Sequence, residues 1–187
     1  MESAYKKILD LLAGSEFKRI LDLLARKGSN EYQDCSSNER ASVMIEALFD
    51  EAEGKVCILS DHLNPLIYGK TEVMDAALGF IQKNGSQLII ILQFNQLGAD
   101  TLPQNKFLSY LVNYRDRISI YLANDLLKDF RNHFMIVKTE KGNNAMMFEL
   151  DIKKHLTTGC FNVGEFGDEL FDFADKAQLV LLRLETI

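Results

Sequence analysis

The strongest constraint in the sequence is an alternation of short apolar runs with amphipathic helical segments that begins near residue 55. The run 87–93 is almost continuously aliphatic, which is typical of a strand covered by helices on both faces. The pattern predicts strands at 55–60, 87–93, 117–122, 133–138 and 145–150, and helices at 39–53, 71–84, 105–114 and 165–177. We therefore expect an α/β fold with a mixed, mostly parallel sheet and helices on both faces.

The first 28 residues predict a separate helical element. The string Ile-Leu-Asp-Leu-Leu-Ala occurs twice, at Ile8–Ala13 and Ile20–Ala25, and Gly14-Ser15 between the copies has the character of a C-cap followed by an N-cap. This indicates an N-terminal helical hairpin over 1–28, a polar loop, and a main α/β domain over 38–187. The hairpin either packs on the domain or binds a protein partner, including a second copy of the chain.

Composition limits the classes of function. The chain has 187 residues, 47% of them hydrophobic, which is enough for one domain with a sizeable core. A net charge of −6 disfavours non-specific nucleic-acid binding, although it leaves a local basic patch open. The three cysteines lack a C-x-x-C pair, the start of the chain is charged, and the longest apolar run is too short to span a bilayer. We expect a cytoplasmic protein with free thiols and no membrane association.

The segment after residue 130 contains the most informative residues. His133 begins an apolar strand, Glu140 follows seven residues later, and Gly159, Cys160 and Asn162 stand before the last helix. These residues resemble the H-x-K-x-x-x-x-D and G-S-x-N motifs of the phospholipase D superfamily, and the resemblance covers about residues 50–178. It implies one half of a phospholipase D-type fold, with His133 as nucleophile, Asn162 on the phosphate and Glu140 in the place of the aspartate.

The motif lacks its lysine. Met135 stands where the lysine belongs, and alternate residues of a strand share a face, so no cation from this position accompanies His133. Loss of one such charge-stabilising group costs about 10²–10³ in rate. We therefore predict a catalytically degenerate phospholipase D-like protein. By family analogy, it would be a binding or assembly module in a larger prokaryotic system, of the kind used in antiviral defence or DNA processing.

Two other functions remain open. The chain could be an active, metal-independent phosphodiesterase or nuclease assembled as a homodimer. Its site would then combine His133 and Asn162 with Glu149 or Glu140, and a loop cation such as Lys128 or Arg131 would join them. Alternatively, it is purely an interaction protein that works through its N-terminal helices.

The remaining candidate residues have ordinary structural explanations beside the functional ones. His133 could be a hydrogen-bonded structural residue. Asp61 and His62 follow the first predicted strand, where open α/β sheets place ligands, but they also fit a turn before Pro65. The three histidines lack metal-binding spacing, and no phosphate-binding or dinucleotide-binding glycine pattern occurs. We expect neither a metal nor a cofactor.

Overall fold

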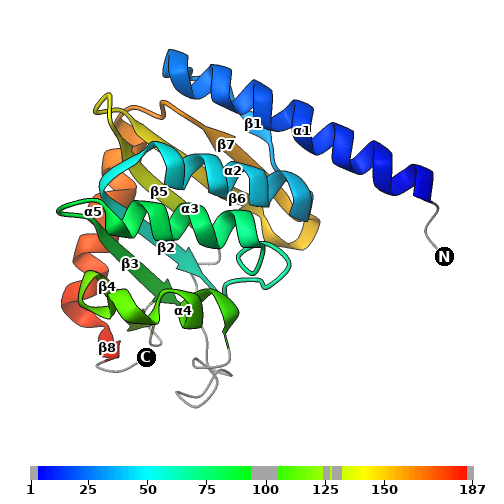
Figure 1. Ribbon diagram of the computed structural model, residues 1–187. Coiled ribbons are helices and arrows are strands. Elements are labelled where there is room, and N and C mark those ends of the chain that lie inside the picture. Colours follow the sequence, from blue (N-terminus) through cyan, green and yellow to red (C-terminus); the bar gives the residue numbers. More distant parts are fainter. Residues whose placement is uncertain (1–3, 94–104, 124–126, 128–131, 185–187) are drawn as a thin grey trace.

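The computed structural model of the chain describes residues 4–93, 105–123, 127 and 132–184, and the side chains at 4–13, 152, 182 and 184 lie outside that description. Within these ranges the chain forms one sheet with helices on both faces (Figure 1).

The described strands form an eight-stranded sheet in the order β1-β7-β6-β5-β2-β3-β4-β8. Their bounds are β1 Gln33–Asp34, β2 Ala52–Ser60, β3 Gln87–Leu92, β4 Ile118–Leu122, β5 Phe134–Thr139, β6 Asn144–Asp151, β7 Leu156–Cys160 and β8 Leu182–Leu184. Strands β2, β3 and β4 are parallel, and the other pairings are antiparallel. The mixed α/β sheet is confirmed. Its parallel part is smaller than expected, because β5, β6 and β7 follow one another through short connections instead of helical crossovers.

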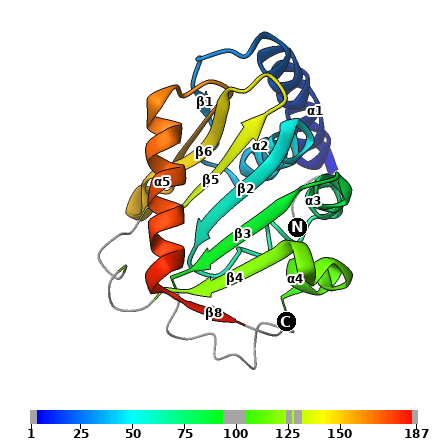
Figure 2. The same ribbon diagram turned by 90° about the vertical axis from the view of Figure 1, so that its left-hand side faces the viewer.

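Helices cover both faces of the sheet. The helices α1 Ala4–Lys27, α2 Asn38–Glu51, α3 Thr71–Gln82 and α4 Lys106–Tyr110 lie on one side, and α5 Glu165–Val180 crosses the other (Figure 2). Short 3-10 helices occupy Val112–Arg117 and Ile152–Lys154. Along β2, Val56 and Ile58 join the core under α2 and α3, whereas Cys57 and Leu59 join the core under α5. This alternation explains why the central strands read as continuous apolar runs.

The N-terminal hairpin is a correction: residues 4–27 form one continuous helix across Gly14-Ser15. Both flanks are rich in good helix formers, and a single interior glycine costs only about 1 kcal/mol, which such flanks offset. The actual stop is Gly28, whose φ is +61°. There the N–H of Gly28 donates to the carbonyl of Ala25 and that of Ser29 to Leu24, at 2.9 and 3.0 Å, a Schellman end.

Helix α1 packs on the domain through its second half. Phe17, Leu21 and Leu24 are buried against the core, while Ile20 and Leu23 stay 40% and 53% exposed. Lys18 pairs with Glu46 of α2. The first half of α1 reaches beyond the sheet in Figure 1. Of the helices in the described part, none combines the length and apolar character that a membrane crossing needs.

The polar segment before α2 is tied to the far edge of the sheet. Strand β1 pairs antiparallel with β7, and the N–H of Cys35 donates to the carbonyl of Thr157 at 2.8 Å. The N–H of Thr157 in turn donates to the hydroxyl of Ser36 at 3.2 Å. Ser37 then caps α2 by accepting from the N–H of Arg40. The start of α2 is thereby held beside the start of β7.

Candidate functional site

A cleft of about 620 Å³ lies where β2 ends and β5 begins. Its lining comes from the start of α2, the end of β2 with the segment after it, the start of β5, the end of β6 and the start of β7. All three histidines of the chain, His62, His133 and His155, line it. The cleft therefore gathers residues from five separate parts of the sequence.

His133 is held by a carboxylate on the neighbouring strand. Oε2 of Glu149 lies 2.7 Å from Nδ1 of His133, and the two side chains are 24% (His133) and 14% (Glu149) exposed. The peptide N–H of Glu149 donates to the carbonyl of His133 at 2.8 Å, and Asn132 donates its side-chain amide to the carbonyl of Glu149 at 2.8 Å. A carboxylate on Nδ1 sets the orientation of an imidazole and leaves Nε2 for a ligand.

A second histidine–carboxylate pair enters from the end of β2. Nδ1 of His62 lies 2.5 Å from Oδ1 of Asp61, which also accepts the N–H of His62 at 2.7 Å. These side chains are 44% and 40% exposed, so this pair is more open to solvent than the first.

Backbone strain occurs at the two segments that bring His62 and His155 to the cleft. Among the described residues, Leu63 and His155 are the two non-glycine residues with positive φ, each at +52°. For a branched, fully buried side chain such as Leu63 this conformation is a true outlier. Strained residues of this kind concentrate at functional sites, where the surrounding structure holds them in the unfavourable conformation.

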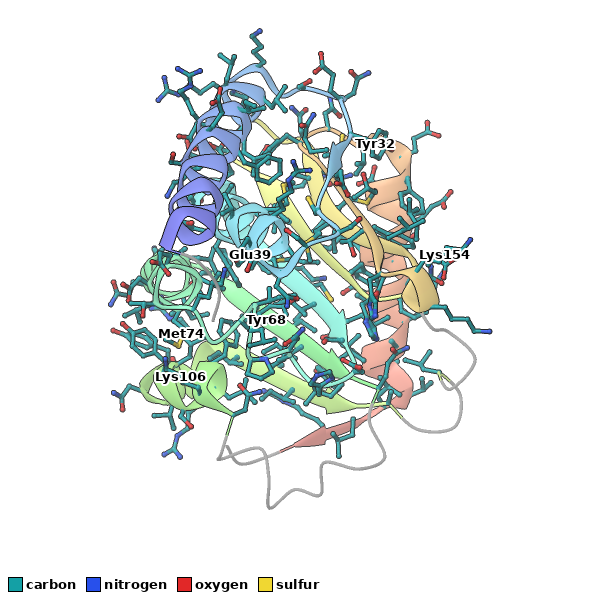
Figure 3. All side chains as sticks on the ribbon, turned by 90° about the vertical axis from the view of Figure 1, so that its right-hand side faces the viewer. Tyr32, Glu39, Tyr68, Met74, Lys106 and Lys154 are labelled. Atoms are coloured by element: carbon teal, nitrogen blue, oxygen red, sulfur yellow. The ribbon has the colours of Figure 1, made fainter. Side chains whose placement is uncertain are left out.

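Tyr68 adds a buried hydroxyl to the lining. It is only 6% exposed, and no hydrogen bond joins its hydroxyl to another described residue. Burial raises the pKa of Tyr68, and the nearby Asp61 carboxylate raises it further, so the phenol stays neutral. Figure 3 views this side of the molecule, with Glu39 at the start of α2 and Tyr68 between β2 and α3.

The cleft is acidic in the described part of the chain. Glu39, Asp61 and Glu149 line it, and no described lysine or arginine does. The described residues also contain no group of three histidine, cysteine or carboxylate side chains placed to hold a metal.

The structure separates the three residues that the motif predicted to act together. His133 lies in the cleft, but Glu140 is exposed in the turn at the other end of β5. Asn162 follows the end of β7, where the N–H of Val163 donates to the carbonyl of Asn144 at the start of β6. Since β5 has six residues, its two ends lie about 17 Å apart.

The reason for this separation is the extra strand β7. Strands β5 and β7 flank β6, so they run in the same direction, and the end of β7 lies far from the beginning of β5. From the β6–β7 side of β5, the residues that can contact His133 come from the end of β6 or the start of β7. The structure places Glu149 there, the residue considered as an alternative to Glu140.

The other motif positions are structural. Met135 shares a face with His133, as predicted, but it is fully buried in the core under the α2 layer and does not line the cleft. A Cβ on Gly159 would lie within 2.6–2.8 Å of the Met44 side chain of α2, so glycine permits this close packing. Cys160 is buried. Lys128 and Arg131, the predicted loop cations, lie outside the described residues.

Several lining residues escaped the sequence interpretation. His155, Tyr68 and Ser36 gave no motif signal, since they approach His133 only through folding. Asp61 and His62 did give one: they follow a strand at the edge where open α/β sheets place ligands.

Comparison with known proteins supports the fold. No protein-family model matches the chain, and no curated protein matches it in sequence. Among solved structures, the chain is similar to TrmBL2, described as an archaeal chromatin protein with a novel mode of DNA binding. The TM-score is 0.57 at 12% identity, covering 96% of this chain, which spans 66% of that protein's length. Nuc from Salmonella typhimurium, a phospholipase D family member, aligns at TM-score 0.49 and 11% identity over 83% of this chain and 99% of Nuc.

Proposed function

We propose that the protein is a catalytically degenerate relative of phospholipase D-type phosphodiesterases that acts as a binding module in a larger prokaryotic assembly. One observation carries the proposal. The cleft at His133 contains no described lysine or arginine, and position 135, where the resemblance expects the lysine, is a methionine buried in the core.

Electrostatics explains why such a cleft would not turn over a phosphodiester. Phosphoryl transfer depends on positioning and on cations that stabilise the charge of the transferring group. Here Glu39, Asp61 and Glu149 instead place carboxylates around His133. An incoming phosphate would meet repulsion from these groups, which is partly relieved only where a histidine is protonated.

Nucleic-acid binding is not part of the proposal. The DNA binding named for TrmBL2 belongs to that protein, of which this chain spans 66% of the length. The chain has a net charge of −6, whereas proteins that hold DNA through its phosphates carry a basic face.

A hydrolysis assay tests the proposal. Purified protein would be incubated with bis(p-nitrophenyl) phosphate, single-stranded DNA and RNA, with and without EDTA. We expect no cleavage above the level of the His133→Ala variant. Metal-independent cleavage that is lost in His133→Ala and retained in Glu140→Gln would overturn the proposal, because Glu140 is exposed at the far end of β5.

An active phosphodiesterase is the second candidate, and one observation favours it. His62 with Asp61 forms a second histidine–carboxylate pair in the same cleft, so one chain supplies two histidines for acid–base chemistry without a homodimer. This candidate predicts that His62→Ala and His133→Ala each abolish cleavage. Light scattering would then show whether activity requires a dimer.

The predicted protein partner would meet α1. Ile20 and Leu23 remain exposed on the half of α1 that packs on the domain, and Figure 1 shows the first half extending outward. The double variant Ile20→Glu/Leu23→Glu should weaken self-association in light scattering while it preserves the fold. The variant Arg19→Glu, at an exposed neighbouring position, is the charge control.

A further inference from the structure

We infer that the cleft binds a primary ammonium group, carried either by a free amine or by a lysine side chain, and excludes phosphate. The inference rests on the proposed function, since it names the ligand class of the same non-catalytic cleft. It joins the acidic lining to an independent observation: Tyr68, a largely buried residue of the cleft, has no hydrogen-bond partner for its hydroxyl among the described residues.

Charge is the first argument. Three carboxylates and no described lysine or arginine line the cleft. A cationic ligand is therefore attracted and an anion repelled.

Hydrogen-bond polarity is the second argument. In neutral imidazole one nitrogen is a donor and the other an acceptor. When Nδ1–H of His133 donates to Glu149, and that of His62 to Asp61, each ring presents the lone pair of Nε2. Both pairs then offer acceptors to the cleft, and an ammonium group supplies three donors.

Tyr68 is the third argument. Its side chain is more than nine-tenths buried, lines the cleft, and has no hydrogen-bond partner among the described residues. A ligand that forms a hydrogen bond with this largely buried hydroxyl gains affinity. The neutral phenol oxygen accepts from an ammonium group as the two imidazoles do.

The start of α2 is the feature that would favour an anion instead. The N-terminus of a helix attracts negative charge. Here Ser37 already caps the helix by accepting from the N–H of Arg40 at 3.2 Å, and Glu39 occupies the first turn with its own carboxylate. The chain thus supplies the negative charge itself. The cleft volume of about 620 Å³ falls within the roughly 300–1,000 Å³ range of small-molecule sites.

Calorimetric titration of the full chain in mildly alkaline, low-salt buffer tests the inference. The probes are putrescine, spermidine, N-acetyl-lysine methylamide and inorganic phosphate. We expect saturable binding of an amine and no binding of phosphate. A preference for putrescine or spermidine identifies a free amine as the ligand, and a preference for the blocked lysine identifies the side chain of a protein partner.

Variants locate the binding. Glu149→Gln and Asp61→Asn should each weaken amine binding about tenfold or more, because each removes a charged acceptor. Tyr68→Phe should weaken it several-fold, and Glu140→Gln, an exposed carboxylate outside the cleft, should leave it unchanged.

Binding of phosphate in preference to amines would overturn the inference, and so would equal losses in Glu140→Gln and Glu149→Gln. Absence of amine binding in a protein that also fails to hydrolyse phosphodiesters would reject this inference alone. Hydrolysis that depends on His133 would reject the proposed function.

Discussion

Glu149 contacts His133 twice, once through its peptide N–H and once through its carboxylate, at 2.8 and 2.7 Å. His133 immediately precedes β5 and lies opposite Glu149 of β6, next to the pair Phe134–Phe148. A shift of one residue in this register would turn Glu149 to the α5 face of the sheet. The histidine–carboxylate pair is therefore a product of the β5–β6 hairpin, and the turn that sets the register also sets the site.

Restoring the missing lysine should damage the protein. Met135 is fully buried in the core, so Met135→Lys places an ammonium group within a cluster of buried apolar side chains. We expect the free energy of unfolding to fall by ~3 kcal/mol or more, measured by urea denaturation. Met135→Leu, a volume-conserving control, should cost less than about 1.5 kcal/mol. A stable Met135→Lys variant that hydrolyses phosphodiesters would show instead that position 135 reaches the cleft.

The glycine of the G-C-F-N segment should be required for packing. Its Cβ would approach the Met44 side chain within 2.6–2.8 Å, so Gly159→Ala should lower the unfolding free energy by about 1–3 kcal/mol. In a Met44→Ala background the same substitution should cost much less, and the coupling in a double-mutant cycle should be about 1 kcal/mol or more. Strictly additive effects would contradict the contact.

The continuity of α1 can be tested at Gly14. This residue is helical, and a Cβ added to it would meet no other atom within 4 Å, so Gly14→Ala should stabilise the protein by about 0.5–1 kcal/mol. Gly14→Pro should cost ~3 kcal/mol and reduce the helical circular dichroism. If residues 1–28 formed a hairpin with a turn at Gly14, alanine would destabilise the protein instead.

The three cysteines should be unreactive in the folded protein. All are buried; burial raises the pKa of Cys35 and of Cys57 to about 12 and raises that of Cys160. Each raised pKa keeps the thiol protonated well above neutral pH, and only the thiolate reacts. Ellman's reagent in mildly alkaline buffer should therefore label the thiols of the native protein only as fast as unfolding exposes them. In denaturant, all three thiols should react at once. Rapid labelling of one native thiol would contradict its burial.

The fold was largely predictable because its central elements carry strong local signals. The aliphatic run of β3 and the hairpin turn at 141–143 both specify their structure without help from distant residues. Strand β7 was not predicted, since Leu-Thr-Thr-Gly-Cys alternates poorly and depends on β6 and β1 for its pairing. At Gly14-Ser15 the local capping signal was outweighed by helix formers on both sides and by the burial of Phe17 and Leu21.

The site was predictable only in part. His133 carried a motif signal, and counting outward from the hairpin turn pairs it with Glu149, so this neighbour follows from the sequence once the turn is known. Asn162 was expected beside His133, because the motif spacing was interpreted without strand β7, which precedes Asn162. The approach of His62 and His155 depends on how two loops meet across the sheet edge, which no local pattern encodes.

Helix α1 is attached to the molecule mainly along α2, with Lys141 of the β5–β6 turn bonding the carbonyls of Ala25 and Arg26 at its end. An element held through so few neighbours can undock as a unit while the sheet stays intact. Its amide protons should then exchange with solvent before those of β2 and β3. Each such opening would briefly expose the apolar surface of α2 that α1 covers. The protein would thus open in stages, with its amino-terminal helix as the first part to leave.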